Sequence, residues 1–224
     1  MCHFTPTESL IELALGDTYL KDDPAHNDNP LPVELTAFNG ASTSAGIKLN
    51  WTTQSETDNA GFVLLRNGQE VASHTNTTAL KGQGTKSGVT NYTYTDMEAE
   101  LGLTYTYKLR SVDLSGQTHD YPRTVSVKMT EAVPGKTYNY DLSQNYPNPF
   151  NPSTTILYQM KEAGIAKLVV YDVLGREVVS RALQANKGWN EYKFNAASLG
   201  SGVYFYRLSV GGQFDKTMKM MLMK

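Results

Sequence analysis

The chain has 224 residues, of which 40% are hydrophobic, and its formal net charge at pH 7 is −2. This length is enough for two domains of about 100 residues each, and the hydrophobic content excludes a chain that is disordered throughout. The charge is uneven, because residues 1–140 hold ten Lys and Arg against sixteen Asp and Glu, whereas residues 141–224 hold ten against six. Two units with different surfaces are therefore indicated. Since no dense cluster of Lys and Arg occurs, we expect no nucleic-acid partner.

Residues 1–30 are expected to be a lead-in without a core of its own. Thr7 can cap a short helix over residues 8–15, whose apolar side chains fall on one face. The following stretch, 21–30, is polar and bounded by prolines, which indicates a loop or linker. Residues 1–20 also lack the basic start and the unbroken apolar core of a secretory signal peptide.

Residues 31–130 contain short alternating segments separated by turn residues, which is the pattern of a β-sandwich. Segment 47–51 alternates with its apolar side chains inward. Asn67-Gly68 predicts a tight hairpin turn, because both central residues of a type I′ turn need positive φ. The Thr- and Gly-rich stretch 75–88 predicts a long loop.

A second sandwich is predicted for residues 142–224, after an interdomain linker at 131–141 that Pro and Gly keep irregular. Its last strand, 214–223, buries alternate residues, so Lys219 falls on the accessible face. The outer edge of this strand is expected to be free, which would let a partner add a strand to it. The predicted fold class is therefore all-β: two sandwiches in tandem behind a short helical or irregular lead-in.

The sequence predicts no enzyme, no cofactor and no metal site. It lacks the usual motifs of hydrolases, metalloproteases and phosphate-binding loops. The acidic residues of 21–30 do not fit the spacing of an EF-hand, and Cys2, His3 and His26 lack a fourth zinc ligand. Cys2 is the only cysteine, so no intramolecular disulfide can form.

Four tyrosines in the first sandwich leave a second function open, since aromatic rings can stack on sugars. Their places in predicted strands favour a role in the core instead. The four are Tyr92, Tyr94, Tyr105 and Tyr107.

The first sandwich resembles a fibronectin type III domain. The resemblance rests on Trp51 in the second strand and on the Tyr-x-Tyr-x-Leu pattern at 105–109. The segments Leu-Pro-Val-Glu-Leu at 31–35 and Trp-Thr-Thr-Gln-Ser-Glu at 51–56 are similar to a variant that precedes sorting tails in exported Bacteroidetes-type proteins.

Residues 142–224 closely resemble the type A C-terminal sorting domain of the type IX secretion system. The shared motifs occur in order: Tyr-Pro-Asn-Pro at 146–149, Val-Tyr-Asp-Val-Leu-Gly-Arg-Glu-Val at 170–178, Gly-Val-Tyr-Phe-Tyr at 202–206 and a Lys-rich final strand. The methionines of that strand depart from the smaller aliphatic residues usual there. The Ig-like domain of flagellar hook-capping proteins is a more distant resemblance.

The resemblance to the sorting domain implies a route and a set of partners. It implies export through the periplasm, recognition by the type IX translocon, removal of the tail by sortase components, and attachment to anionic lipopolysaccharide or release at the surface of a Bacteroidetes/Chlorobi-type cell. It also points to sorting-signal residues, for which turn geometry or protection of a strand edge is the alternative explanation. These are Pro147, Asn148, Pro149, Asp172, Gly175, Gly202, Val203, Tyr204 and Lys219.

The sequence is therefore interpreted as the non-catalytic C-terminal portion of a secreted or cell-surface protein. The first sandwich would be a spacer, the second a signal for type IX secretion and surface attachment, and residues 1–30 a remnant of an upstream part. Two alternatives remain open: a carbohydrate-binding or adhesive module, and the tail of a secreted hydrolase whose catalytic domain lies upstream. A reading frame continuous with Met1 on its upstream side would decide for the hydrolase.

Overall fold

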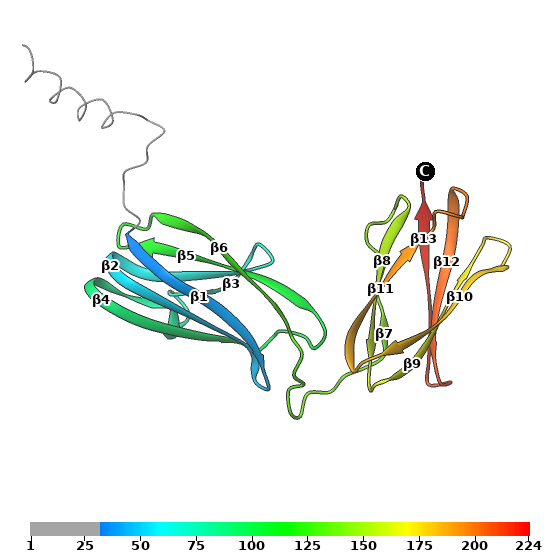
Figure 1. The fold of residues 1–224 in the computed structure, drawn as a ribbon, viewed down its shortest axis with the longest axis horizontal. Coiled ribbons are helices and arrows are strands. Elements are labelled where there is room, and N and C mark those ends of the chain that lie inside the picture. Colours follow the sequence, from blue (N-terminus) through cyan, green and yellow to red (C-terminus); the bar gives the residue numbers. More distant parts are fainter. Residues whose placement is uncertain (1–31) are drawn as a thin grey trace, which may run out of the picture.

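The computed structural model describes residues 32–224, which form two packed β units (Figure 1). The all-β fold class is confirmed for this part of the chain. The helix predicted over 8–15 and the polar stretch 21–30 lie outside the described residues, as do the cysteine and the two histidines considered as metal ligands. The described part contains one short helical turn, Thr78–Leu80, and no helix with the length and hydrophobicity required to cross a membrane.

The first sandwich is built around β2 (Gly46–Arg66), which contributes to both of its layers. The first half of β2 pairs with β1, and the second half pairs with β3 and β5. Strand β4 pairs with β2 from Ile47 to Gly61, and β6 lies beside β5. Trp51 and Phe62, one from each half, meet edge to face with their ring centroids 5.4 Å apart. The two halves therefore face each other across the core. The other strands are β1 (Val33–Thr43), β3 (Gln69–Ser73), β4 (Lys81–Asp96), β5 (Thr104–Asp113) and β6 (Thr118–Lys128).

The core of this sandwich confirms the inward positions predicted for segment 47–51, whose three apolar side chains are buried. Trp51 stacks on Tyr92 with 5.3 Å between the ring centroids. The predicted hairpin turn is also confirmed, because Asn67 and Gly68 both have positive φ, at 52° and 83°.

The long loop predicted over 75–88 is wrong in its second half. Strand β4 begins at Lys81, which lies opposite Gly61 of β2. The carboxylate of Glu56, also on β2, accepts a hydrogen bond from the backbone N–H of Gln83 at 2.9 Å. Glycines lower the local strand propensity of this stretch, so its pairing depends on contacts with β2 that the local sequence does not report.

The second sandwich has seven strands in two sheets. One sheet has the order β10-β9-β12-β13, the other the order β11-β8-β7. Its core is a hydrophobic cluster separate from that of the first sandwich. The strands are β7 (Asp141–Leu142), β8 (Ser153–Met160), β9 (Gly164–Tyr171), β10 (Glu177–Ala185), β11 (Gly188–Asn195), β12 (Gly202–Val210) and β13 (Phe214–Leu222).

The two sandwiches touch where the loop before β5 meets the start of β11. The N–H of Trp189 donates to the carbonyl of Leu101 at 2.7 Å, and its indole N–H donates to the Glu100 carboxylate. Gly102 approaches so closely that a Cβ atom there would stand 1.9 Å from the carbonyl oxygen of Trp189. A cavity of about 1000 Å³ lies beside this contact and is lined by both units.

The segment predicted as a linker, 131–141, packs against the sandwiches. Val133 packs on the first core, and its N–H donates to the hydroxyl of Tyr138 at 3.3 Å. Tyr138 is buried, and the ammonium of Lys187 lies 4.6 Å from the centroid of its ring. The chain between the sandwiches is therefore held by contacts from both sides.

Candidate functional site

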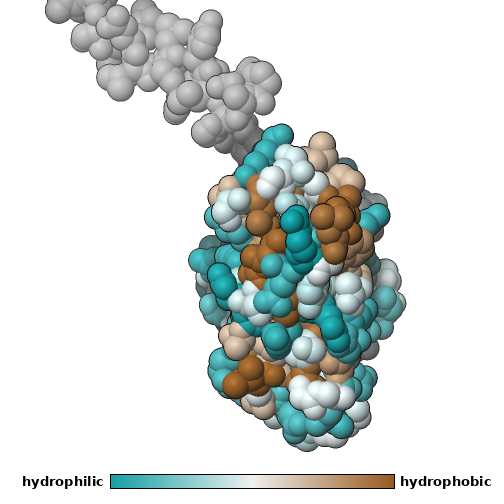
Figure 2. Space-filling model, turned by 90° about the vertical axis from the view of Figure 1, so that its right-hand side faces the viewer, coloured by the Kyte–Doolittle hydropathy of each residue, from teal (hydrophilic) through white to brown (hydrophobic). Residues whose placement is uncertain are grey.

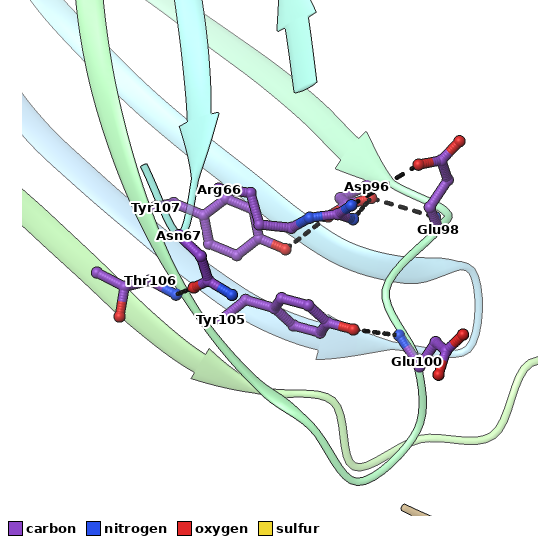
Figure 3. A network of polar contacts seen from close by, with 8 residues as sticks. All are labelled: Arg66, Asn67, Asp96, Glu98, Glu100, Tyr105, Thr106 and Tyr107. Carbon is purple, nitrogen blue, oxygen red and sulfur yellow. Dashed lines mark hydrogen bonds and ion pairs between the residues drawn. The ribbon is translucent and has the colours of Figure 1, made fainter. Parts of the chain in front are cut away.

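Two buried carboxylates of the first sandwich are bonded within the fold. Asp96 accepts hydrogen bonds from Arg66 Nη1 at 2.8 Å and from the hydroxyl of Tyr107 at 2.7 Å (Figure 3). Burial and this bond to Asp96 raise the pKa of Tyr107. Glu56 is 1% exposed and accepts from four donors. These are Thr53 Oγ1 at 2.9 Å, Asn59 Nδ2 at 2.8 Å, the Gln83 N–H at 2.9 Å and the Tyr92 hydroxyl at 2.5 Å.

The tyrosines considered for sugar stacking belong mainly to the core. Tyr92, Tyr105 and Tyr107 are buried, and Tyr94 is half-buried. A ring whose face is covered by other side chains cannot stack on a sugar. The cavity at the end of the first sandwich where β1 begins, about 800 Å³ in volume, is a separate place and is lined partly by polar side chains.

The segment that leads into the second sandwich is tied to its core by polar groups. The N–H of Asn145 donates to the hydroxyl of Tyr206 at 2.8 Å, and that hydroxyl donates to the carbonyl of Ser143 at 2.7 Å. The side-chain amide of Asn145 donates to Thr154 Oγ1 at 2.9 Å. Burial raises the pKa of Tyr206 to about 12. The peptide bonds before Pro147 and Pro149 are both cis.

Residues 144–150, which we call the edge clip, cover the outer edge of β13. Phe150 forms a parallel bridge with Leu222: its N–H donates to the carbonyl of Met221 and its carbonyl accepts from the N–H of Met223, both at 3.0 Å. Asn148 Oδ1 accepts from the N–H of Met221 at 2.9 Å.

Gln144 completes the clip, since its Nε2 donates to the carbonyl of Lys219 at 2.8 Å. The expectation of a free outer edge is therefore wrong for the end of β13. From the carbonyl of Lys219 to the N–H of Met223, the backbone groups that face away from β12 are bonded to the edge clip.

The face of β13 is as predicted. Met220 and Leu222 are buried, whereas Lys219 and Met221, which alternate with them, are exposed. Lys219 lies opposite Phe205 of β12. The methionines thus keep the alternation of a strand with one buried face.

Asp172 organises the turn between β9 and β10. Its Oδ1 accepts from the N–H groups of Leu174 and Arg176 at 2.9 and 3.0 Å, and its Oδ2 accepts from Arg176 Nε at 2.7 Å. Gly175 has φ of +76°, which favours glycine. Desolvation acts to raise the pKa of Asp172, but the hydrogen bonds from Arg176 and Leu174 outweigh it and lower the pKa. The turn exposes Val173 and Leu174.

The predicted sorting-signal residues come together at one end of the second sandwich, uppermost in Figure 1. Tyr171, just before the Asp172 turn, lies opposite Phe205, and Val203 lies opposite Met221. Because the edge clip bonds to this same end of β13, its prolines and Asn148 are there as well. Gly202 begins β12.

Several residues of this end were not singled out from the sequence. The edge clip bonds to β13 through Gln144 and Phe150. It is anchored to the core by the hydrogen bond from the Asn145 N–H to the hydroxyl of Tyr206. A buried tyrosine in a strand gives a signal, since its hydroxyl needs a partner, but that signal does not say which residue the partner is. In the part of the chain that the structure describes, no group of three or more His, Cys, Asp or Glu side chains is placed to hold a metal ion.

Comparison with known proteins places residues 144–223 in a family described as the secretion system C-terminal sorting domain. The second sandwich is therefore a domain of this family. No curated protein matches the chain in sequence.

Several solved structures are similar to the chain over most of its length. They include dimeric latent PorU from Porphyromonas gingivalis (17% identity, 85% of this chain and 20% of that chain, TM-score 0.33) and the fibronectin III array of RIM-binding protein (9% identity, 88% and 70%, TM-score 0.28). Chicken CNTN1 FN1–FN3 is similar at 10% identity, over 86% of this chain and 67% of that one, with a TM-score of 0.26. The chain spans about a fifth to a quarter of the first three structures matched.

Proposed function

We propose that this chain is a non-catalytic region of an exported protein, in which the first sandwich is a spacer and the second is the signal for type IX secretion and surface attachment. The observation that carries the proposal is the sorting-domain match over residues 144–223. The chain thereby contains the sorting region of a secreted or cell-surface protein. The spacer role and the lack of catalysis are our inference.

The geometry of the second sandwich supports a role as a signal. Its candidate residues lie on four separate stretches of chain that meet at one end of the domain, so only a folded domain displays them together. A partner that reads this end would therefore distinguish a folded tail from an unfolded one. On this proposal the partners are the translocon and sortase components, with anionic lipopolysaccharide following after processing.

The geometry of the first sandwich supports a spacer. Its buried carboxylates, Asp96 and Glu56, are engaged by donors of the same domain. It also contacts the second sandwich through Trp189, and such a contact holds the signal at a set distance from whatever precedes the spacer.

The cavity of about 800 Å³ in the first sandwich favours one alternative, a ligand-binding module. Its volume falls in the range typical of small-molecule sites, and Asp113, His119 and Arg123 help to line it. A glycan array probed with the full chain tests this alternative. Binding that Arg123→Ala abolishes would favour it over a spacer.

The experiment that tests the sorting function uses the full chain behind a signal peptide in a host with type IX machinery. The comparison chain stops after Met129, which removes the second sandwich and keeps all the buried residues of the first core. We expect the full chain at the cell surface and the shortened chain in the periplasm. Equal surface amounts of the two chains would refute the sorting assignment.

A further inference from the structure

Parts of both edges of the four-stranded sheet in the second sandwich are covered. The edge clip bonds the end of β13 from Lys219 to Met223. At the opposite edge, Arg181 Nη1 on β10 covers the carbonyl of Ser180 at 2.8 Å. Charged side chains and covering segments are the usual means of blocking strand addition. A partner that reads this sheet therefore meets its outer face more readily than its edges.

The outer face of the sheet carries an unusual apolar row. Phe205 stands between Tyr171 of β9 and Lys219 of β13, and Val203 lies opposite Met221 one step further on. Phe205 is 36% exposed and Met221 is 37% exposed. Outward positions of an antiparallel sheet that faces water are commonly polar. Figure 2, which views the right-hand side of Figure 1, shows brown apolar surface interspersed with hydrophilic groups on that side of the molecule.

Charged residues border this row on both sides, because Lys219 lies opposite Phe205 and Glu177 lies opposite Tyr171. Lys219 and Lys167 are exposed on the same face, and no ion pair involves either of them among residues 32–224. Arg207 is paired with Asp215. The face thus has an apolar centre with two lysines and one glutamate, Glu177, beside it, in a region whose ten Lys and Arg outnumber its six Asp and Glu.

We propose that this row, made of Tyr171, Val203, Phe205 and Met221 with Lys219 at its border, docks a protein partner of the secretion machinery whose surface sets carboxylates around an apolar patch. The inference rests on the sorting function proposed above and names the chemistry of its partner. Aromatic and Met side chains are enriched in the buried centres of protein interfaces, whereas unpaired charges belong to the rim. Complementary charge at the rim speeds encounter and sets orientation.

The charge count favours a protein over a lipid surface. Recognition of anionic membranes typically relies on clusters of about four to eight Lys and Arg. The face offers two cations without an acidic partner, Lys167 and Lys219, which is few for a membrane and sufficient for the rim of a protein interface.

The test compares single substitutions in the full chain, exported from a host with type IX machinery. Phe205→Thr removes the centre of the row and keeps a strand-forming residue, and Lys219→Glu reverses the border charge. Ile165→Thr is the matched control for the first, because Ile165 is 62% exposed on the same sheet away from the row. Lys193→Glu, on the other sheet, is the control for the second. Thermal unfolding of each purified chain verifies that it is folded.

We expect Phe205→Thr to lower the ratio of surface to periplasmic protein by about tenfold, as for a residue at the centre of an interface. Lys219→Glu should lower it by a similar factor, because the reversed charge at the rim would face the partner's carboxylates, and the controls should leave it unchanged. If Phe205→Thr is found unfolded, Lys219→Glu decides alone, since its side chain is exposed. Normal export of the folded variants overturns the inference while leaving the sorting function intact. Equal loss in the controls overturns the assignment to this row.

Two further outcomes separate the partner from its alternatives. Vesicles that contain anionic lipopolysaccharide are sedimented with the purified chains. Variants that are exported normally but no longer sediment with the vesicles would make the row a lipid contact and overturn the protein partner. If the unmodified chain itself stays in the periplasm, the sorting function fails first and this inference fails with it.

Discussion

Replacing Glu56 should destabilise the first sandwich more than any surface change. Its carboxylate accepts four hydrogen bonds at 2.5–2.9 Å while almost wholly buried. In Glu56→Leu the hydroxyls of Thr53 and Tyr92 can turn to other acceptors. The side-chain NH₂ of Asn59 and the backbone N–H of Gln83 cannot, and both lose their acceptor. A buried donor left without a partner costs about 1–3 kcal/mol, so we expect the free energy of unfolding to fall by about 4 kcal/mol.

Glu56→Gln should be much milder. The amide oxygen can face the two amide donors, and the amide NH₂ group can face the two hydroxyls, which turn to accept. The variant loses the negative charge of the acceptor. A hydrogen bond to a charged acceptor is roughly twice as strong as one to a neutral acceptor. We expect the free energy of unfolding to fall by about 1–2 kcal/mol at pH 7. The control Glu34→Gln, at an exposed position, should change it by less than about 0.5 kcal/mol.

The pH dependence of the free energy of unfolding tests the same hydrogen-bond network independently. Burial acts to raise the pKa of Glu56, but the hydrogen bonds from Tyr92, Gln83, Asn59 and Thr53 outweigh it and leave the pKa below the ordinary value of 4.5. The stabilisation is therefore fully present above about pH 4.5 and is lost as the pH falls through the folded-state pKa. The Gln variant cannot titrate, so the advantage of the native chain over it should shrink at about pH 3.

Urea unfolding followed by the fluorescence of Trp51 measures these differences. A Trp189→Phe background confines the signal to the first sandwich, where Trp51 stacks on Tyr92. The reasoning is refuted if Glu56→Leu costs less than about 1 kcal/mol. It is also refuted if the difference between the native and Gln chains is the same at both pH values.

Two further predictions concern the edge clip and the junction. Asn148→Ala removes the acceptor of the Met221 N–H, so amide exchange at Met221 and Met223 should accelerate about fivefold for a bond worth about 1 kcal/mol. Asn151→Ala, at an exposed neighbouring position, should leave that exchange unchanged, and a clip that did not close the edge would show no difference between the two. Gly102→Ala places a methyl group against the carbonyl of Trp189 and should separate the sandwiches, which small-angle scattering would record as a larger radius of gyration. Gly116→Ala has a similar positive φ but open space around it, so an equal expansion in that control would contradict the account of the junction.

Alternation along the chain was enough to predict most of the strands and the buried face of the last one. The period of two at 47–51 and at 214–223 reports a side chain's face directly, because successive residues of a strand point to opposite sides. The stretch 81–88 was missed because its glycines give no such pattern. Its place in the sheet comes from Glu56 and the backbone of β2.

The edge clip could not be predicted for a different reason. Its side-chain bonds join residues 73 to 75 positions apart. A side-chain amide such as that of Asn148 or Gln144 can accept a hydrogen bond from, or donate one to, any exposed backbone group. The prolines restrict the backbone of the segment locally, but the sequence does not show which strand the segment would lie against. The junction is a similar case, since Gly102 and Gly188 are typical turn residues when each is considered alone.

The edge clip also has a consequence for the order in which the polypeptide is made. Residues 144–150 leave the ribosome well before Met221 and Met223, whose N–H groups they and their neighbours must bind. Until those last partners are synthesised, Phe150 and Asn148 have nothing to close upon, and the end of the sandwich that gathers the candidate residues remains unfinished. A chain that is truncated before Met221 therefore cannot assemble this end of the domain. The assembled end occurs only in chains whose translation has passed Met221.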